Sequence, residues 1–385
     1  MKIVFVSNFI NHYQVPVSDE LYKLTNGDYY FVETEELPTS FKKGGFADYE
    51  KPYIVRAWHN EDERKRALEL SYDADVLIAG GGRFVLPYER KRLKHNKLTF
   101  EYAERSLKKG WINLFSPTNV IMQLNYHLFF YNKPFFKLCV SAFTANDMYL
   151  QRAFKKKCYK YGYFPNIPQI DVHKVLDSRK KDGILRMIWC ARFIPWKHPE
   201  MVINLAKKLK ERGLPFEINM IGGGMLFDEI SKSIKTEKLT NEVHLLGNIP
   251  NSDVLDVMGQ HDVFLFTSDQ NEGWGVVLNE AMGQVCCPVA ANKIGAVPYL
   301  MEDGRNGLIF ESCNVDSLFN KIKYLIERPD AMKIMAMEAY NTVSELWSAK
   351  TAADRLYKLC EAKLNGDDIQ FNNGPLSIAL PINMR

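Results

Sequence analysis

Residues 263–284, VFLFTSDQNEGWGVVLNEAMGQ, are the part of the sequence that decides the fold. The apolar run 263–268 predicts a buried strand, and a glycine-rich turn around Trp274 leads into an amphipathic stretch that predicts a helix from about Gly275. A buried strand followed directly by a helix is the repeating unit of parallel α/β sheets. We therefore expect an α/β protein with doubly wound parallel sheets.

Two acidic residues flank this turn. Glu272 lies in the loop after the strand and Glu280 lies on the helix, so the two carboxylates are about 10 Å apart at the helical rise per residue. Free N–H groups at the helix start, together with the helix dipole, favour an anion between them. The spacing fits the diphosphate of a nucleotide sugar, with an ordinary capped helix as the alternative. The residues expected around this ligand are Gly273, Trp274, Gly275, Val276 and Val277.

The same alternation of strand and helix extends along the chain in both directions from this segment. In the second half, strands are predicted at 185–193, 216–224, 243–248 and 288–292, with helices at 201–213, 252–260 and 275–284. In the first half, strands are predicted at 3–8, 29–34, 75–81, 111–116 and 137–142, with helices at 15–24 and 60–72.

A proline-rich segment, Tyr163–Gln169, interrupts this alternation, because proline supplies no backbone donor and disfavours helix in the preceding residue. With 385 residues the chain is long enough for two domains. We expect a first domain at 1–165, joined by a C-terminal helix within about 347–385, and a second at 166–346. Ligands of such folds bind at the carboxyl ends of the strands, so a cleft between the domains is the predicted site.

The run from Glu272 to Phe310 resembles the signature region of glycosyltransferase family 4. That pattern has two glutamates eight positions apart, then Glu-Ala-Met, Pro-Val, Gly-x-Val-Pro and Asn-Gly, and all of these are present. The sequence departs from it at Tyr299, where the family commonly has Glu, and at Cys286–Cys287, where a Gly-x pair is usual. The resemblance implies the GT-B architecture, with two Rossmann-like domains facing across a cleft and the last helix returning to the first domain. It also implies retaining sugar transfer from a nucleotide-diphosphate sugar.

The resemblance also implies roles for individual residues. Glu272 is expected to hold hydroxyls of the donor sugar and Glu280 the ribose, while Arg192 and Lys197, in the segment WCARFIPWKHPE, contact the diphosphate. Further donor contacts are expected from a glycine-rich strand end and from a segment that reads the base. These residues are Gly222, Gly223, Gly224, Leu246 and Gly247.

On the acceptor side, the segment VSNFINHYQVPVSDEL resembles a loop that lines the cleft in family members. A second glycine-rich segment, AGGGRF at 79–84, ends a predicted strand and is equally well explained by turn geometry. By the habits of the family, the acceptor is a lipid-linked saccharide of a surface polysaccharide or glycolipid. The residues expected to contact it are Asn8, His12, Tyr13 and Gln14.

The charge of the chain is unevenly distributed. Between Arg83 and Lys160 there are 16 lysines and arginines against four acidic residues, although the net charge of the whole chain is only +4. Such a basic stretch can bind an anionic membrane surface, with a solvated face as the alternative. We expect the membrane, and no nucleic acid, as the partner of residues 83–160.

Neither a signal peptide nor a membrane span is predicted. The start MKIVFVSNF reads as a buried strand, and the apolar stretch 127–143 is interrupted by Lys133, Pro134 and Lys137. Seven cysteines without a CxxC pair favour a reducing compartment, with Cys286–Cys287 as small core residues. We expect a cytoplasmic enzyme, peripheral on the inner face of the cell membrane.

No metal and no cofactor are expected, because two fixed cations five residues apart, Arg192 and Lys197, can neutralise the charge of a leaving diphosphate. The nucleotide sugar is then a substrate. Two alternatives stay open: a nucleotide-sugar epimerase of the same fold and a non-catalytic nucleotide-sugar-binding subunit. A nicotinamide-dependent dehydrogenase is disfavoured, since no early strand is followed by G-x-G-x-x-G and a later acidic residue.

Overall fold

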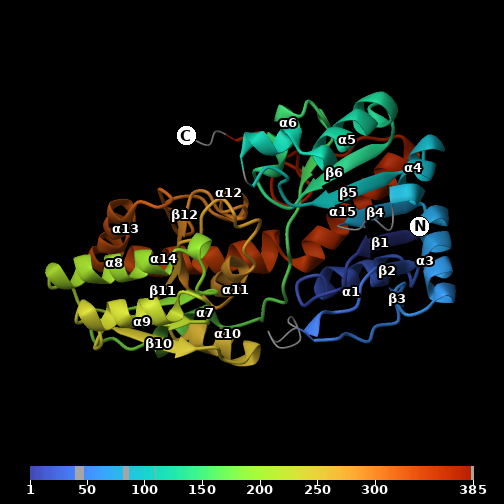
Figure 1. Ribbon diagram of the computed structural model, residues 1–385. Helices are drawn as coiled ribbons and strands as arrows, with labels where there is room; N and C mark the ends of the chain where they lie inside the picture. Colours follow the sequence, from blue (N-terminus) through green and yellow to red (C-terminus); the bar gives the residue numbers. More distant parts are fainter. Residues whose placement is uncertain (40–46, 81–85, 109, 383–385) are drawn as a thin grey trace. The chain divides into compact units, whose positions relative to one another are not determined.

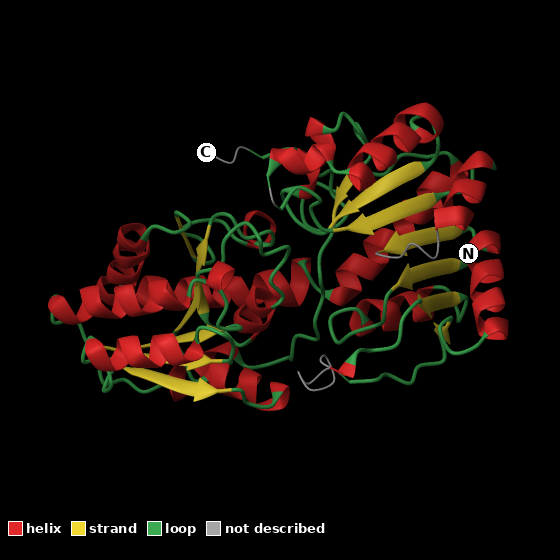
Figure 2. Cartoon of the chain, in the orientation of Figure 1, coloured by secondary structure: helices red, strands yellow, loops and turns green. Residues whose placement is uncertain are grey.

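The computed structural model describes residues 1–39, 47–80, 86–108 and 110–382 (Figure 1). The chain divides into two compact units. Unit 1 comprises Met1–Asn166 together with Trp347–Arg385, and unit 2 comprises Ile167–Leu346. In each unit the strands form one sheet that is accompanied by helices (Figure 2).

The described strands of unit 1 form one parallel sheet in the order β3-β2-β1-β4-β5-β6-β7. The order reverses beside β1, which is the topological switch point at which doubly wound sheets bind ligands. The strands are β1 (Ile3–Ser7), β2 (Tyr29–Glu33), β3 (Ile54–Arg56), β4 (Val76–Gly80), β5 (Thr99–Ala103), β6 (Phe135–Cys139) and β7 (Cys158–Lys160).

Two helices of unit 1 show how the sequence sets helix ends. The side chain of Asn60 accepts a hydrogen bond from the backbone N–H of Glu63 at 2.8 Å and so caps the start of α3. The last long helix, α15, ends at a left-handed glycine, Gly366. The helices are α1 (Val15–Leu24), α3 (Glu61–Asp73), α4 (Leu86–Lys94), α5 (Pro117–Asn125), α6 (Thr144–Leu150) and α15 (Ala349–Asn365), with short turns η1 (Trp111–Phe115) and η2 (Tyr126–Phe130).

One predicted strand is wrong. Residues 111–115 form the 3-10 helix η1, in which Ile112 and Phe115 are exposed, and the strand at this point of the sheet is β5. Glu101 interrupts the apolar pattern of β5, but it faces Lys137 on β6 and pairs with it at 2.8 Å. The short strands β3 and β7 were not predicted either, because three residues carry too little periodicity.

Unit 2 contains a second parallel sheet, whose described strands run in the order β10-β9-β8-β11-β12-β13. The strands are β8 (Leu185–Cys190), β9 (Phe216–Ile221), β10 (Val243–Gly247), β11 (Val263–Phe266), β12 (Cys287–Ala291) and β13 (Leu308–Phe310). The helices are α7 (Val172–Ser178), α8 (Pro199–Glu211), α9 (Phe227–Thr236), α10 (Asn251–Gly259), α11 (Val277–Gly283), α12 (Val297–Leu300), α13 (Val315–Glu327) and α14 (Pro329–Asn341), with short turns η3 (Pro195–Lys197) and η4 (Thr342–Leu346).

The predicted fold class of two Rossmann-like parallel-sheet units is confirmed. The predicted return of the last helix is confirmed as well, because α15 belongs to unit 1 and packs against α1. The tail after Gly366 is irregular but packed. The backbone of Lys160 donates to Ser377 at 2.8 Å, and Leu376 and Ala379 are buried.

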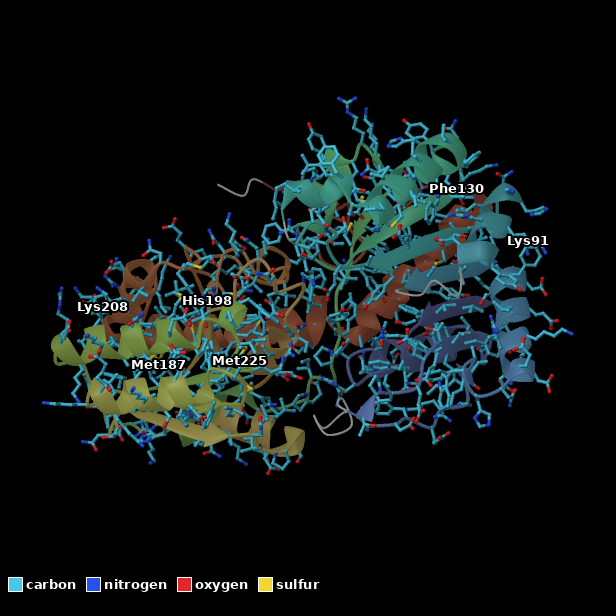
Figure 3. All side chains as sticks on the ribbon, in the orientation of Figure 1. Lys91, Phe130, Met187, His198, Lys208 and Met225 are labelled. Carbon is cyan, nitrogen blue, oxygen red and sulfur yellow. The ribbon has the colours of Figure 1, made fainter. Side chains whose placement is uncertain are left out.

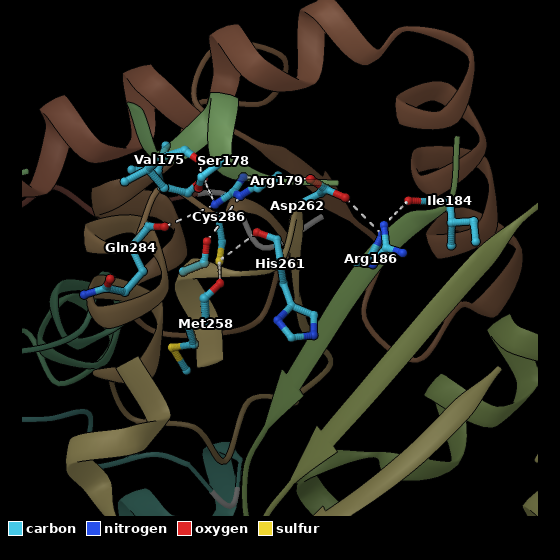
Figure 4. Close-up of polar contacts among 12 residues, drawn as sticks. Val175, Ser178, Arg179, Ile184, Arg186, Met258, His261, Asp262, Gln284 and Cys286 are labelled. Atoms are coloured by element: carbon cyan, nitrogen blue, oxygen red, sulfur yellow. Dashed lines mark hydrogen bonds and ion pairs between the residues drawn. The ribbon is translucent and has the colours of Figure 1, made fainter. Parts of the chain in front are cut away.

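A polar network holds the amino-terminal side of the second sheet (Figure 4). The guanidinium of Arg179 donates to the carbonyls of Gln284 and Val285 at 3.3 and 3.1 Å, and the thiol of Cys286 donates to the carbonyl of Met258 at 3.1 Å. Cys286 and Cys287 are fully buried, which confirms their interpretation as small core residues. Their departure from the family pattern is therefore accommodated inside the unit.

Candidate functional site

Three loops of unit 2 meet at one edge of its sheet. Strands β9, β8 and β11 are neighbours, and the segments that follow them carry the predicted glycines, the predicted cations and Glu272, respectively. Because parallel strands end at the same edge, the three loops emerge side by side. The backbone N–H of Phe193 donates to the carbonyl of Gly223 at 2.9 Å, which joins the first two loops directly.

An ion pair joins the loop after β11 to the loop after β8. Lys197 forms an ion pair with the carboxylate of Glu272, and both side chains are largely buried. The hydroxyl of Ser268 donates to the same carboxylate at 3.0 Å, and that of Thr267 donates to the carbonyl of Lys197 at 2.6 Å. Two predicted catalytic residues are therefore in direct contact and held from both sides.

Arg192, the other predicted cation, is exposed at the end of β8. Its guanidinium lies 5.9 Å from the ring centroid of Trp196, and within the described residues it has no carboxylate partner. An exposed arginine beside an established ion pair is a ready binding group for a further anion.

The glycines after β9 are required by close packing. Gly222 and Gly224 have φ angles of +125° and +148°, and a Cβ on Gly222 would lie 2.0 Å from the carbonyl oxygen of Ala191. A Cβ on Gly224 would lie 2.6 Å from the oxygen of Phe193. These glycines thus allow the β9 end to pack against the backbone on both sides of Arg192.

Gly275 has a similar function in the third loop. Its φ angle is +89°, and a Cβ there would lie 2.4 Å from the ring of Phe266 and 3.2 Å from the Cγ atom of Glu272. The backbone N–H groups of Gly275, Val276 and Val277 donate to no described acceptor. Helix α11 begins at Val277, two residues later than predicted, and is only seven residues long, so its dipole is a weak part of any anion site.

Glu280 lies on α11, close to the end of β8. Burial raises the pKa of the Cys190 thiol to about 12, and the charge of Glu280 raises it further while that of Lys197 lowers it. Cys190 is the last residue of β8, so both charged groups lie within electrostatic reach of the same strand end. The structure thereby gathers Glu272, Lys197 and Glu280 around one edge of the sheet.

Other predicted donor residues differ in their exposure. Trp274 is buried, and its indole N–H donates to the side chain of Asn279 at 2.9 Å, so its ring belongs to the interior of the unit. Gly247 accepts a hydrogen bond from the backbone of Gly222 at 2.8 Å and has a φ angle of +67°. Leu246 is exposed beside it. The base-reading segment therefore adjoins the glycine-rich strand end.

His198 was not singled out from the sequence, although it follows Lys197 directly. His198 directly precedes α8 (Figure 3). Its backbone is left-handed, and its ring nitrogens lie 2.7 Å from a Glu200 oxygen and 3.2 Å from an Asp269 oxygen. The bond to Glu200 contributes most to raising the pKa of His198, and Asp269 raises it further. His198 therefore ties the loop of Lys197 to the loop of Glu272.

The predicted acceptor loop connects β1 to α1 in unit 1. The ring of Tyr13 lies 4.2 Å from that of Tyr163 between centroids, and the side chain of Asn8 accepts a hydrogen bond from Ser7 at 3.1 Å. The ring of His12 contacts that of Tyr13. The side-chain oxygen of Gln14 is buried and has no hydrogen-bond partner among the residues that the structure describes.

Asn11, which was not predicted, has an equally unpartnered side-chain oxygen in the same loop. Two such oxygens at the carboxyl end of β1 support a ligand that donates hydrogen bonds. Within the other glycine-rich segment, 79–84, residues 81–84 lie outside the described part of the chain.

The basic stretch 83–160 is only partly a surface. Arg92 is fully buried and donates to five backbone carbonyls, and Lys137 and Arg105 are buried in ion pairs with Glu101 and Asp147. Arg83 and Lys109 lie outside the described residues. The exposed cations of this stretch are Arg90, Lys91, Lys94, Arg152, Lys155 and Lys156.

The next features are the acidic residues that could hold a metal and the helices that could cross a membrane. The chain contains one Asp-x-Asp, Asp73-Ala74-Asp75, which lies at the amino-terminal end of β4, where Asp75 accepts from the backbone of Lys2 at 2.7 Å. Across the residues described, no three His, Cys, Asp or Glu side chains gather as metal ligands. None of the helices in that same part of the chain combines the length and the apolar character needed to cross a bilayer.

Residues 172–342 match the sequence model of the family described as glycosyl transferases group 1. An uncharacterized glycosyltransferase of Methanocaldococcus jannaschii is 29% identical over 149 residues, covering 38% of this chain and 40% of the relative. A GDP-mannose-dependent alpha-(1-6)-phosphatidylinositol monomannoside mannosyltransferase of Mycolicibacterium smegmatis is 22% identical over 204 residues, covering 51% and 53%. The matched part thus spans about half, or less, of these relatives.

Among solved structures, Anabaena HepE in complex with UDP superimposes with a TM-score of 0.70 at 17% identity, covering 94% of this chain and 100% of that chain. This likeness shows the fold, and the protein has the GT-B fold. The stretch that matches the model of glycosyl transferases group 1 includes Arg192, Lys197, Glu272 and Glu280.

Proposed function

We propose that this protein is a glycosyltransferase that moves a sugar from a nucleotide-diphosphate sugar to a hydroxyl of a saccharide acceptor, with retention of anomeric configuration and without a metal. The observation that carries the proposal is the contact between Lys197 and Glu272, with the exposed Arg192 in the same loop as Lys197. The loops after β8 and β11 thus carry one carboxylate for sugar hydroxyls and two cations for a diphosphate.

In this mechanism the bond between the anomeric carbon and the diphosphate breaks while the acceptor oxygen bonds to the same carbon on the same face. The acceptor proton passes to the departing diphosphate oxygen. Arg192 and Lys197 stabilise the charge that develops on this leaving group, and the N–H groups of Gly275 and Val276 add hydrogen bonds.

The two glutamates have separate roles in the proposal. Glu272 holds hydroxyls of the donor sugar, and its ion pair with Lys197 keeps both groups oriented before the donor binds. Glu280 binds the ribose, and Leu246 and Gly247 contact the base. Support comes from Anabaena HepE, which has the same fold and whose solved complex contains UDP.

The acceptor side is proposed to use Asn8, His12, Tyr13 and Gln14, and the acceptor to be a lipid-linked saccharide. The mycobacterial relative, by its name, acts on a phosphatidylinositol mannoside, which supports a lipid-borne acceptor. Association with an anionic membrane surface through the stretch 83–160 belongs to the same proposal. It is supported by the exposed apolar side chains Leu128 and Phe129, which lie in the same stretch as the exposed cations.

The test is to incubate the full-length protein with UDP and GDP sugars, with and without lipid extracts as acceptors, and to measure free nucleoside diphosphate. Release that requires acceptor supports a transferase. Conversion of the sugar without acceptor would identify an epimerase, and donor binding without turnover would identify a binding subunit. The configuration of the new bond, read by NMR, decides between retention and inversion.

A further inference from the structure

A cavity of about 520 Å³ lies inside unit 1, apart from the donor site. Its lining residues lie on β4, β5, β6, α4, α5, η2 and α6 and in the loops that follow β5 and α6. Its volume is in the range of small-molecule sites, and its lining surface is mainly apolar with a few polar groups. The apolar walls include Met122, Tyr126, Phe130, Phe135 and Phe154, and the ionised or ionisable groups include Glu89, Glu101 and Lys137.

Glu89 is a buried carboxyl group with no assigned function. It is 7% exposed, and within the described residues no hydrogen bond reaches it. Its neighbours Glu101 and Lys137 already pair with each other at 2.8 Å. Because Glu89 lines the cavity, its carboxyl group is accessible to a polar group of a ligand that enters the cavity.

The protonation state of Glu89 indicates what it can bind. The pKa of Glu89 is raised to about 8, chiefly by burial and also by the charge of Glu101, while the charges of Lys137 and Arg90 act in the opposite direction. At neutral pH the carboxyl group is therefore mainly protonated, and it can donate one hydrogen bond and accept another. A ligand hydroxyl is complementary to this group, and it can also donate to Glu101.

The cavity opens onto an apolar surface. Ile121 and Met122 line it and are also 56% and 46% exposed. Ile121 is followed on α5 and η2 by exposed Leu124 and Leu128, at the three- and four-residue spacing that places side chains on one helix face. Apolar surface thus continues from the interior of the cavity to the outside of the protein.

We propose that this cavity binds an amphiphilic lipid, with a hydroxyl-bearing headgroup at Glu89, Glu101 and Lys137 and an apolar chain leaving along Ile121 and Leu124. Binding of this lipid does not depend on the proposed function, because the residues proposed to contact the acceptor lie outside the cavity lining. The paired charges of Glu101 and Lys137 select an uncharged headgroup, because either sign of charge would meet one repelling partner.

Binding is tested with 1-monodecanoylglycerol below its aggregation concentration, titrated into the full chain without donor and followed by calorimetry. We expect saturable binding, with glycerol and decanoate each about tenfold weaker or more, since each lacks half of the recognised ligand. Glu89→Leu and Ile121→Glu should each weaken binding by about tenfold. The matched control is Ile334→Glu, at an equally exposed isoleucine on α14 of unit 2, and it should bind like the wild type.

The conservative variant Glu89→Gln keeps both a donor and an acceptor. It should retain binding across pH, whereas wild-type binding should fall as pH rises through about 8 and Glu89 ionises. Non-saturable binding, or equal affinity in Glu89→Leu, Ile121→Glu and wild type, would overturn the proposal. Thermal unfolding of each variant verifies that the compared proteins are folded.

A transfer assay, run beside the binding titration, separates this proposal from the proposed function. If the amphiphile binds as expected and no donor supports transfer, the transferase assignment fails and the cavity site stands. If transfer occurs and Glu89→Leu and Ile121→Glu bind the amphiphile as tightly as the wild type, the cavity site is wrong and the transferase stands.

Discussion

Lys197 and Glu272 form an ion pair although 75 residues separate them in the chain. The pair connects the loop after β8 to the loop after β11, and hydrogen bonds from Ser268 and Thr267 fix it on both sides. Because both side chains are largely buried, loss of either partner leaves a poorly solvated charge. The Lys197–Glu272 pair therefore has two effects: it stabilises the loops after β8 and β11, and it holds the two side chains in place for the proposed reaction.

The two glutamates should differ in kinetic effect. Glu272→Gln removes the charge that orients Lys197 and the sugar, so we expect kcat to fall by about 10²- to 10³-fold. Glu280→Gln should mainly raise the donor KM, by about tenfold, because it removes a binding contact to the ribose. Steady-state kinetics with a verified donor measures both. Unchanged kinetics in both variants would contradict their proposed roles.

Arg192 should contribute to binding of the diphosphate and little to stability, because it is exposed and unpaired among the described residues. Arg192→Ala should weaken nucleoside diphosphate binding by about tenfold or more, and Arg192→Lys should recover part of it, since lysine keeps the charge but not the planar fork. Arg328→Ala, at an exposed arginine elsewhere in unit 2, is the control. Equal affinities in all three variants would exclude a role for Arg192.

Gly222 should be sensitive to substitution for a steric reason. Its φ angle is +125°, and the added Cβ of Gly222→Ala would meet the carbonyl of Ala191, so we expect a loss of about 2–4 kcal/mol in the free energy of unfolding. Gly213 also has a positive φ angle, +65°, but open space around it, so Gly213→Ala should cost only about 1 kcal/mol. Urea unfolding compares them. Similar losses would mean that packing against Ala191 is unimportant.

His198 should make stability depend on pH. Contacts with Glu200 and Asp269 raise its folded pKa above the ordinary value of 6.5. The stabilisation is therefore complete below about pH 6.5 and is lost as pH rises through the higher folded pKa. The Tm difference between wild type and His198→Gln should therefore become smaller as the pH rises from about 6.5 through the folded pKa of His198. A difference that stays constant with pH would show that the imidazole charge has no such effect.

Activity should survive chelation, because two protein cations are proposed to stabilise the leaving group. Transfer in excess EDTA should equal transfer in its absence within a factor of about two, far less than the loss expected when a metal stabilises the transition state. Loss of activity that returns with added Mg²⁺ or Mn²⁺ would contradict the metal-independent mechanism.

The fold could be predicted largely because its central strands are continuous apolar runs. Segments such as 263–266 predict a buried strand, and the glycines that follow these segments indicate where the strands end. Strand β5 was missed because Glu101 interrupts its pattern, and the compensating Lys137 lies on another strand. Local sequence cannot reveal such a pairing.

The candidate site could be predicted from the sequence for a similar reason. Arg192, Lys197, Glu272 and Glu280 stand in recognisable motifs, and their roles stay predictions, while the structure shows that Lys197 contacts Glu272. His198 was missed because its partner Asp269 is 71 residues away and no motif connects them. The cavity around Glu89 was missed for a related reason: its lining comes from several strands and helices that only the folded chain brings together.

The central claim is that the edge formed by the β8 and β11 loops binds the diphosphate of a nucleotide sugar. Calorimetric titration of UDP and GDP into wild type and into Arg192→Ala/Lys197→Ala tests it most directly. We predict one site per chain for one of the two nucleotides, with an affinity at least tenfold weaker in the double variant. Unchanged affinity in a folded double variant, or no binding of either nucleotide to wild type, would contradict the claim.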